Sequence, residues 1–132
     1  MHKVLAAFLC AVLLSTASAF AAEATFPDKP IRLVIGSAAG SGPDLISRVL
    51  ADRLLRSWGQ RVLVGARRGA AGIVSAEVVL CAPADGDTWM MLTSQLLVAT
   101  SVFPNVKFNL EKDFASVSLI GTVPFVLVAN PQ

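Results

Sequence analysis

The sequence has little histidine and cysteine, and both shortages exclude whole classes of chemistry. The only histidine is His2, and the only cysteines are Cys10 and Cys81. His2 and Cys10 lie in an N-terminal stretch with the pattern of a cleaved leader, so the remainder has no imidazole and one thiol. This excludes Ser-His and Cys-His pairs and histidine-ligated zinc. It also excludes an intramolecular disulfide, and Cys81 is expected to be a buried apolar residue.

A strong charge and a long hydrophobic run are missing too. The formal net charge is +2 at pH 7, and the arginines are spread over the chain, so nucleic acid is not an expected partner. The apolar run 4–14 has about eleven residues, whereas a membrane-spanning helix needs roughly twenty. The sequence contains neither a low-complexity tract nor an internal repeat. A permanent membrane anchor and a repeat architecture are therefore not expected.

The N-terminus is typical of a secretory signal. Lys3 precedes the apolar run, and the small residues of 15–22 offer cleavage points after Ala19, Ala21 or Ala22. We therefore expect residues 1–22 to be a cleaved signal peptide. Residues 23–132, roughly 110 in number, are enough for one small domain or for part of a larger one.

The most informative segment is 31–55. Residues 31–35 predict a short buried strand, 36–42 form a glycine-rich loop, and Pro43-Asp44 begin a helix. A small-residue loop at this point lets backbone N–H groups face a ligand, and the helix dipole favours negative charge there. The segment predicts an anion cradle. A plain strand-to-helix turn that needs glycine only for positive φ is the alternative.

The loop lacks the residues of the best-known cradles. Gly42 is followed by Pro43-Asp44 instead of the Lys-Ser or Lys-Thr of a Walker loop. The glycine spacing does not fit the dinucleotide fingerprint, and the centre of the five-residue window from Gly36 is Ala38, where a nucleophile elbow has serine. Nucleotide phosphate and nucleophilic catalysis are both disfavoured.

Strand and helix patterns alternate along the rest of the chain. The helix from Pro43 to about Gly59 is expected to bury an apolar face and to expose its charges; the apolar face comprises Leu45, Ile46, Val49, Leu50 and Leu54. Further strands are predicted at 62–64, 88–92, 115–121 and 125–129, and further helices at 72–82 and 96–102. Asp85-Gly86-Asp87 is read as a turn.

This alternation predicts an α/β fold with a doubly wound, mostly parallel sheet. Small ligands bind beyond the carboxyl ends of the strands in such sheets. The loops that begin at Gly36, Gly65 and Thr93 would share that edge, which favours one site built from all three.

Five segments, taken in order, resemble one known family. Residues 26–34 are similar to its aromatic-Pro-x-Lys/Arg-Pro-Ile start, and 40–44 to its glycine triplet, variable residue and Asp. Residues 67–72 fall at its Arg/Lys-Pro-Gly-Ala-Gly-Gly loop, 83–88 at its Pro-x-Asp-Gly-x-Thr turn, and 112–120 at its Lys-Asp-Phe-x-Pro segment. Behind a secretory signal, the chain thus resembles the periplasmic substrate-binding proteins of tripartite tricarboxylate transporters, the Bug-type receptors.

The resemblance implies a periplasmic receptor of the periplasmic-binding-protein type II-like fold, without enzymatic activity or cofactor. Such a receptor closes two lobes over a small carboxylate and presents it to a membrane permease. Backbone amides, hydroxyls and bridging water hold the carboxylate in the family, with Ser41 and Gly42 as candidate direct donors here. The implied ligand-binding residues are Ala38, Ala39, Gly40, Ser41, Gly42, Asp44, Thr93, Ser94 and Gln95.

Several readings stay open. Asp44 is expected to accept hydrogen bonds from helix N–H groups, water or a ligand amino group, or only to complement the helix dipole. Arg68 replaces the family proline and is read as an exposed loop residue or as a partner of a carboxylate. The resemblance covers less than half of a family member, so we expect an incomplete first lobe. The alternatives are an α/β enzyme that binds phosphate or nucleotide and a periplasmic interaction module without a transport role.

Overall fold

The computed structural model describes residues 26–124 and 126–130, so the predicted signal peptide lies outside the described residues. Seven elements follow one another along the chain. They are β1 (Ile31–Ile35), α2 (Gly42–Trp58), β2 (Val62–Ala66), the 3-10 turn η1 (Ala70–Gly72), α3 (Ile73–Leu80), β3 (Thr88–Met91) and α4 (Ser94–Val102). Among the helices described here, none is long and apolar enough to cross a bilayer.

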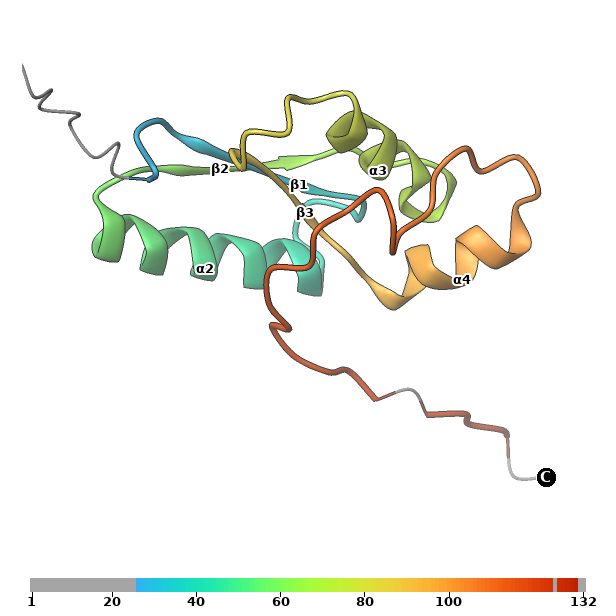
Figure 1. The fold of residues 1–132 in the computed structure, drawn as a ribbon. Coiled ribbons are helices and arrows are strands. Elements are labelled where there is room, and N and C mark those ends of the chain that lie inside the picture. Colours follow the sequence, from blue (N-terminus) through green and yellow to red (C-terminus); the bar gives the residue numbers. More distant parts are fainter. Residues whose placement is uncertain (1–25, 125, 131–132) are drawn as a thin grey trace, which may run out of the picture.

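The strands form one parallel sheet in the order β2-β1-β3. Ile35 at the end of β1 is in register with Ala66 of β2 and with Met91 of β3. Helix α2 covers one face of the sheet and α3 the other (Figure 1). The α/β fold with a doubly wound, parallel sheet is confirmed, and so are the first three predicted strands within two residues at each end.

Strand β1 is the centre of the core because it is buried on both faces. Ile31 and Leu33 pack with Ala51 of α2 and with Val62. On the other face, a second cluster joins Ile73 and Ala76 of α3 to Leu96 and Ala99 of α4. Arg32 is the exposed position in an otherwise buried strand. Burial at four of the five positions is typical of a strand that lies between helices.

The predicted buried face of α2 is wrong for Leu45, Ile46 and Val49, which are exposed, whereas Leu54 packs against the core. The helix buries Asp44, Ser47 and Ala51, which are spaced i, i+3 and i+7, whereas Leu45 is 56% and Val49 61% exposed. The small side chains of Ser47 and Ala51 let the helix approach the sheet closely, and the Ser47 hydroxyl donates to the Pro43 carbonyl at 2.7 Å. Asp44 lies on the same buried face and accepts the Gly40 N–H at 2.7 Å.

The two C-terminal strands are not formed in the described residues. Residues 115–124 and 126–130 have no strand assignment and run away from the sheet as an extended segment (Figure 1). Their apolar side chains are exposed, with Leu127 at 99%. A strand needs a neighbour for its backbone groups. This segment has the apolar pattern of a strand, but none of the described strands pairs with it, so it forms no strand there.

Cys81 is exposed, so the expectation of a buried thiol is wrong. The residue is the C-cap of α3, where the chain leaves the helix for the turn that precedes β3. Cysteine is apolar enough to be buried, but a helix end at the surface gives it nothing to pack against.

Lys29 forms ion pairs at the amino edge of the sheet. The Lys29 ammonium lies 2.9 Å from an Asp85 oxygen and 2.7 Å from an Asp87 oxygen. The hydrogen bond to Asp87, followed by the one to Asp85, raises the pKa of Lys29. The Lys29 ammonium, followed by the Asp87 N–H, holds the pKa of the Asp85 carboxyl below its ordinary value. Asp85 also accepts the Asp87 N–H at 3.1 Å, which confirms the predicted turn. The segment before β1 is thereby joined to the turn before β3.

Two alanines in the loop after β2 adopt left-handed backbone conformations. Ala70 has φ 44° and Ala71 has φ 53°, a region that costs an L-residue about 1 to 2 kcal/mol. Ala71 stands where the resembled family has glycine. The loop shape is therefore retained at the expense of backbone strain.

We predict that Ala71→Gly stabilises the protein. Glycine removes the left-handed strain but adds freedom to the unfolded chain, so the net gain in the free energy of unfolding is about 0.5 to 1 kcal/mol. Urea denaturation followed by circular dichroism measures it. Ala84→Gly, in an exposed turn without positive φ, is the matched control and is expected to lose stability. Equal effects of the two substitutions would contradict the prediction.

Candidate functional site

Three loops meet at the carboxyl edge of the sheet, as the alternation of strands and helices predicts. A Cβ at Gly36 would lie 2.8 Å from the Gly72 Cα and 2.8 Å from the Ser75 Oγ. A Cβ at Gly72 would lie 3.6 Å from the Leu96 Cβ. The loop after β1, the end of η1 and the first turn of α4 are thus in van der Waals contact. Glycine is required at 36 because any side chain would collide with the backbone of the neighbouring loop.

The first loop is fixed by its own hydroxyl groups. The Ser41 Oγ donates to the Ala38 carbonyl at 2.6 Å and lies 3.0 Å from the Ser37 Oγ. The Ser41 N–H donates to the same carbonyl at 3.2 Å. The Ser41 side chain is therefore committed to the loop itself. Ser37 is a participant that the sequence patterns did not indicate.

The buried carboxylate of Asp44 accepts hydrogen bonds from the loop and from Arg48. Its Oδ2 accepts the Gly40 N–H at 2.7 Å and the Arg48 Nε–H at 3.0 Å, and the side chain is 2% exposed. Asp44 is expected from the sequence to accept hydrogen bonds from helix N–H groups, water or a ligand. In the structure the backbone N–H that it accepts belongs to Gly40 of the loop. The buried Oδ1 has no hydrogen-bond partner among the described residues.

This contact sets the charge of Asp44. The Arg48 guanidinium, followed by the Gly40 N–H, holds the pKa of the Asp44 carboxyl below its ordinary value of 3.8. A folded-state pKa below the unfolded one means that the carboxylate stabilises the fold above that ordinary value. The contribution is lost as the pH falls through the lowered pKa. Near neutral pH, Asp44 and Arg48 form an ionised pair.

The outer amides of the loop are free within the described part of the chain. Ala38 and Ala39 are exposed, and their N–H groups donate to no group there. The first N–H groups of α2 also lack intrahelical acceptors, and Pro43 has no N–H. Together with the positive end of the α2 dipole, these groups can accept an anion.

The second set of predicted residues lies at the start of α4. Thr93 is the N-cap in an extended conformation and its side chain makes no capping hydrogen bond. Ser94 and Gln95 are exposed in the first turn of α4. The helix thus begins two residues before the predicted start at residue 96. Among the described residues, no hydrogen bond joins this set to 38–44. The contacts of Gly36 and Gly72 connect the two sets.

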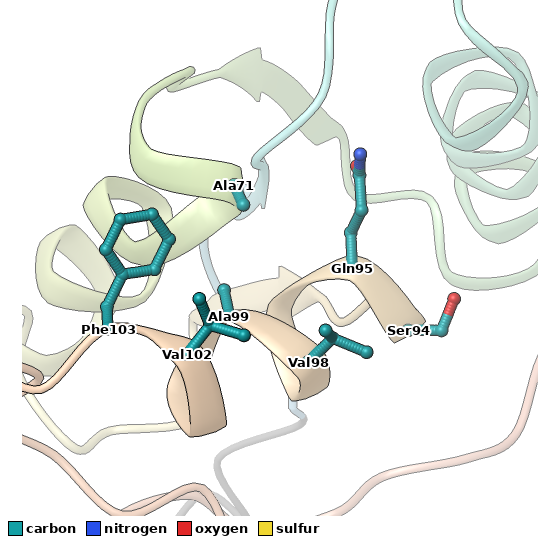
Figure 2. Close-up of a pocket in the computed structure, with 7 residues that line it drawn as sticks. All are labelled: Ala71, Ser94, Gln95, Val98, Ala99, Val102 and Phe103. Carbon is teal, nitrogen blue, oxygen red and sulfur yellow. The ribbon is translucent and has the colours of Figure 1, made fainter.

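An apolar groove of about 380 Å³ runs along α4 from these residues. In Figure 2, Val98, Val102 and Phe103 follow one another along the helix, Ala71 of η1 lies opposite, and Gln95 extends from the first turn. The groove is lined by Ala71, Ser94, Gln95, Val98, Ala99, Val102 and Phe103. None of residues 38–44 lines it, so the groove adjoins the cradle without including it.

Arg48 belongs to the site, although the sequence did not indicate this role for it. Its spacing of four from Asp44 predicts no more than one of the exposed charges expected of this helix. Arg48 is exposed, in agreement with that reading, whereas Asp44 is buried. Arg68 is exposed as well, which agrees with the first of its two readings. The signal for the pair was an acid at a helix start with a base one turn later.

Comparisons with known proteins identify relatives of this chain. The family profile described as tripartite tricarboxylate transporter family receptor matches residues 46–132. Protein BugT of Bordetella pertussis is 36% identical over 110 residues, which are 82% of this chain and 34% of that protein. A UPF0065 protein from the tcbD-tcbE intergenic region of Pseudomonas sp. is 35% identical over 127 residues, 96% of this chain and 38% of that protein.

Solved structures also resemble the chain. An R. palustris protein with adipate shares 32% identity, with a TM-score of 0.48 over 49% of this chain and 22% of that chain. A TctC solute binding protein from Polaromonas, without ligand, shares 28% identity, with a TM-score of 0.49 over 52% of this chain and 24% of that chain. The chain spans about a third of the length of the curated relatives it matches.

We predict that Gly36→Ala disrupts the meeting point of the loops. The new methyl group would lie 2.8 Å from the Gly72 Cα, and the forced shift should lower the free energy of unfolding by about 1 to 3 kcal/mol. Urea denaturation followed by the fluorescence of Trp58 and Trp89 measures the loss. Gly65→Ala is the matched control, because a Cβ at Gly65 meets nothing within 4 Å. Similar stabilities of the two variants would show that the loops do not meet as described.

Proposed function

The chain belongs to the tripartite tricarboxylate transporter receptor family, and we propose on this premise that it is an extracytoplasmic solute-binding receptor, or part of one. Its ligand would be a small carboxylate, delivered to the membrane permease of the transporter. The proposal includes a periplasmic location, reached through cleavage of the signal peptide 1–22, and residues 23–132 as part of a first lobe. It includes no enzymatic activity and no cofactor.

The observation that carries the proposal is the pair of free amides at Ala38 and Ala39. Both residues are exposed a few positions before α2, and their N–H groups donate to no group in the described residues. A carboxylate has two oxygens that each accept hydrogen bonds, so two adjacent amides suit it. Gly42 is a further candidate donor, since the first helical N–H groups have no intrahelical acceptor.

The start of α4 supplies the second half of the proposed contact. Thr93, Ser94 and Gln95 offer hydroxyl and amide groups that are exposed or half-buried, at the edge of the sheet shared with the first loop. Neutral donors of this kind select by geometry and can hold the distant end of a dicarboxylate. Gly40 and Ser41 would contribute indirectly, because the Gly40 N–H and the Ser41 hydroxyl are already engaged.

Other functions have less support. A phosphate or nucleotide is favoured by a cation at the cradle, whereas the charged side chain that contacts a loop amide is Asp44, which is paired with Arg48. No cluster of three or more metal-ligating side chains occurs in the part of the chain that the structure describes. An interaction module without a transport role fits the exposed apolar side chains, but no described feature specifies its partner.

We predict that this chain alone binds carboxylates weakly. Residues 38–40 are exposed, so a bound carboxylate would stay largely in water and gain little net affinity. Titration of the 15N-labelled chain with acetate, adipate and citrate should shift the amide resonances of Ala38 and Ala39 with millimolar dissociation constants. A dissociation constant in the low micromolar range by calorimetry would contradict this expectation.

Two variants of α4 test the location of the site. Gln95→Leu removes an amide from the predicted ligand set and should weaken binding about tenfold if that amide donates to the ligand. Ser101→Ala alters an exposed position near the other end of the same helix and should leave binding unchanged. Carboxylate-induced shifts confined to residues outside 38–44 and 93–95 would place the ligand elsewhere.

A further inference from the structure

We propose that Arg48 is a positioning residue for the loop 36–42, acting through the carboxylate of Asp44 on the Gly40 amide. The inference rests on the proposed function, since the loop matters as a carboxylate cradle. Three atoms carry it: the Arg48 Nε lies 3.0 Å from the Asp44 Oδ2, and the same oxygen lies 2.7 Å from the Gly40 nitrogen.

Burial shows that Asp44 supports the loop and does not itself face a ligand. Asp44 is 2% exposed, whereas Ala38, Ala39 and Gly40 are exposed. The carboxylate therefore lies under the loop and holds it from the inner side. Gly40 has φ 79°, a conformation that glycine adopts and leaves at little cost. Its hydrogen bond to Asp44 is the contact that fixes this otherwise free residue.

Charge explains why an arginine is needed. A buried carboxylate that lacks a counter-charge is costly and would repel a second carboxylate bound above it. Oδ1 of Asp44 is buried without a hydrogen-bond partner among residues 26–124 and 126–130, so the ionised state depends on the two bonds to Oδ2. Arg48 is the only charged side chain in contact with Asp44 in that part of the chain. It keeps Asp44 ionised and offsets the charge beneath the cradle.

An ordinary ion pair one helical turn apart would have a different consequence. Such a pair supports the helix slightly and leaves the preceding loop unaffected. If Arg48 positions the loop, its removal changes the titration of Asp44 and the protection of the Gly40 amide, four residues before the helix acid. These two signals distinguish the roles.

The test is NMR on the whole chain, 15N- and 13C-labelled, with Arg48→Gln compared with Arg53→Gln. Arg53 is exposed on the same helix and makes no ion pair among the described residues. In the wild type, the Gly40 amide proton should titrate together with the Asp44 carboxyl carbon, below the ordinary carboxyl range. Arg48→Gln should raise that midpoint and accelerate hydrogen exchange at Gly40 about tenfold. Arg53→Gln should match the wild type.

Arg48→Lys separates charge from geometry. Lysine keeps the positive charge but lacks the rigid Nε–H that donates to the Asp44 Oδ2, so the Asp44 midpoint should stay low while Gly40 still loses protection. The same variant serves if Arg48→Gln does not fold. Unchanged titration and unchanged Gly40 exchange in the Arg48 variants would overturn the proposal.

Carboxylate titrations of the same samples test the proposed function separately. Arg48→Gln should weaken the acetate-induced shifts at Ala38 and Ala39, whereas Arg53→Gln should not. If acetate, adipate and citrate shift no resonance of the wild type, the receptor function fails. The Gly40 and Asp44 measurements would still decide whether Arg48 positions the loop.

Discussion

The structure depends on its central strand, which is paired along both edges and buried at every position except Arg32. Strand β1 pairs with β2 along one edge and with β3 along the other, and its apolar residues are covered by helices on both faces. Such a strand has no freedom of register, because a shift of one residue would expose part of the core. The loop that follows β1 therefore leaves the sheet at a fixed point. The site takes its position from the most constrained part of the fold.

The elements that could be predicted from the sequence are those whose signals are local. Strand 31–35 is apolar except at Arg32, and 62–64 is a continuous apolar run. Gly59 ends α2 in a left-handed conformation, as glycine at that position predicts. The buried face of α2 could not be predicted from hydrophobicity. Its buried positions, Asp44, Ser47 and Ala51, are polar or small. For segment 115–121 the local pattern predicts a strand, but the described structure has no neighbouring strand for it to pair with, and it forms none.

The site was predictable to the level of loops but not of atoms. The carboxyl edge of a parallel sheet brings the three loops together, and glycine at 36 and 72 permits the contact. Which amides stay free depends on side chains that turn inward, as Ser41 and Asp44 do. A sequence pattern assigns donors to a loop without revealing which of them the protein uses itself. Gly40 donates its amide to Asp44, whereas Ala38 and Ala39 donate theirs to no described group.

The exposed thiol at the end of α3 has a practical consequence. Cys81 is the only cysteine in residues 26–130, and it follows the helix whose other end meets the cradle at Gly72. A fluorophore or spin label attached there would occupy a single defined place, one short helix away from the loops. The molecule thus carries a built-in attachment point for spectroscopy, from which distances to the cradle can be followed without altering any residue of the site.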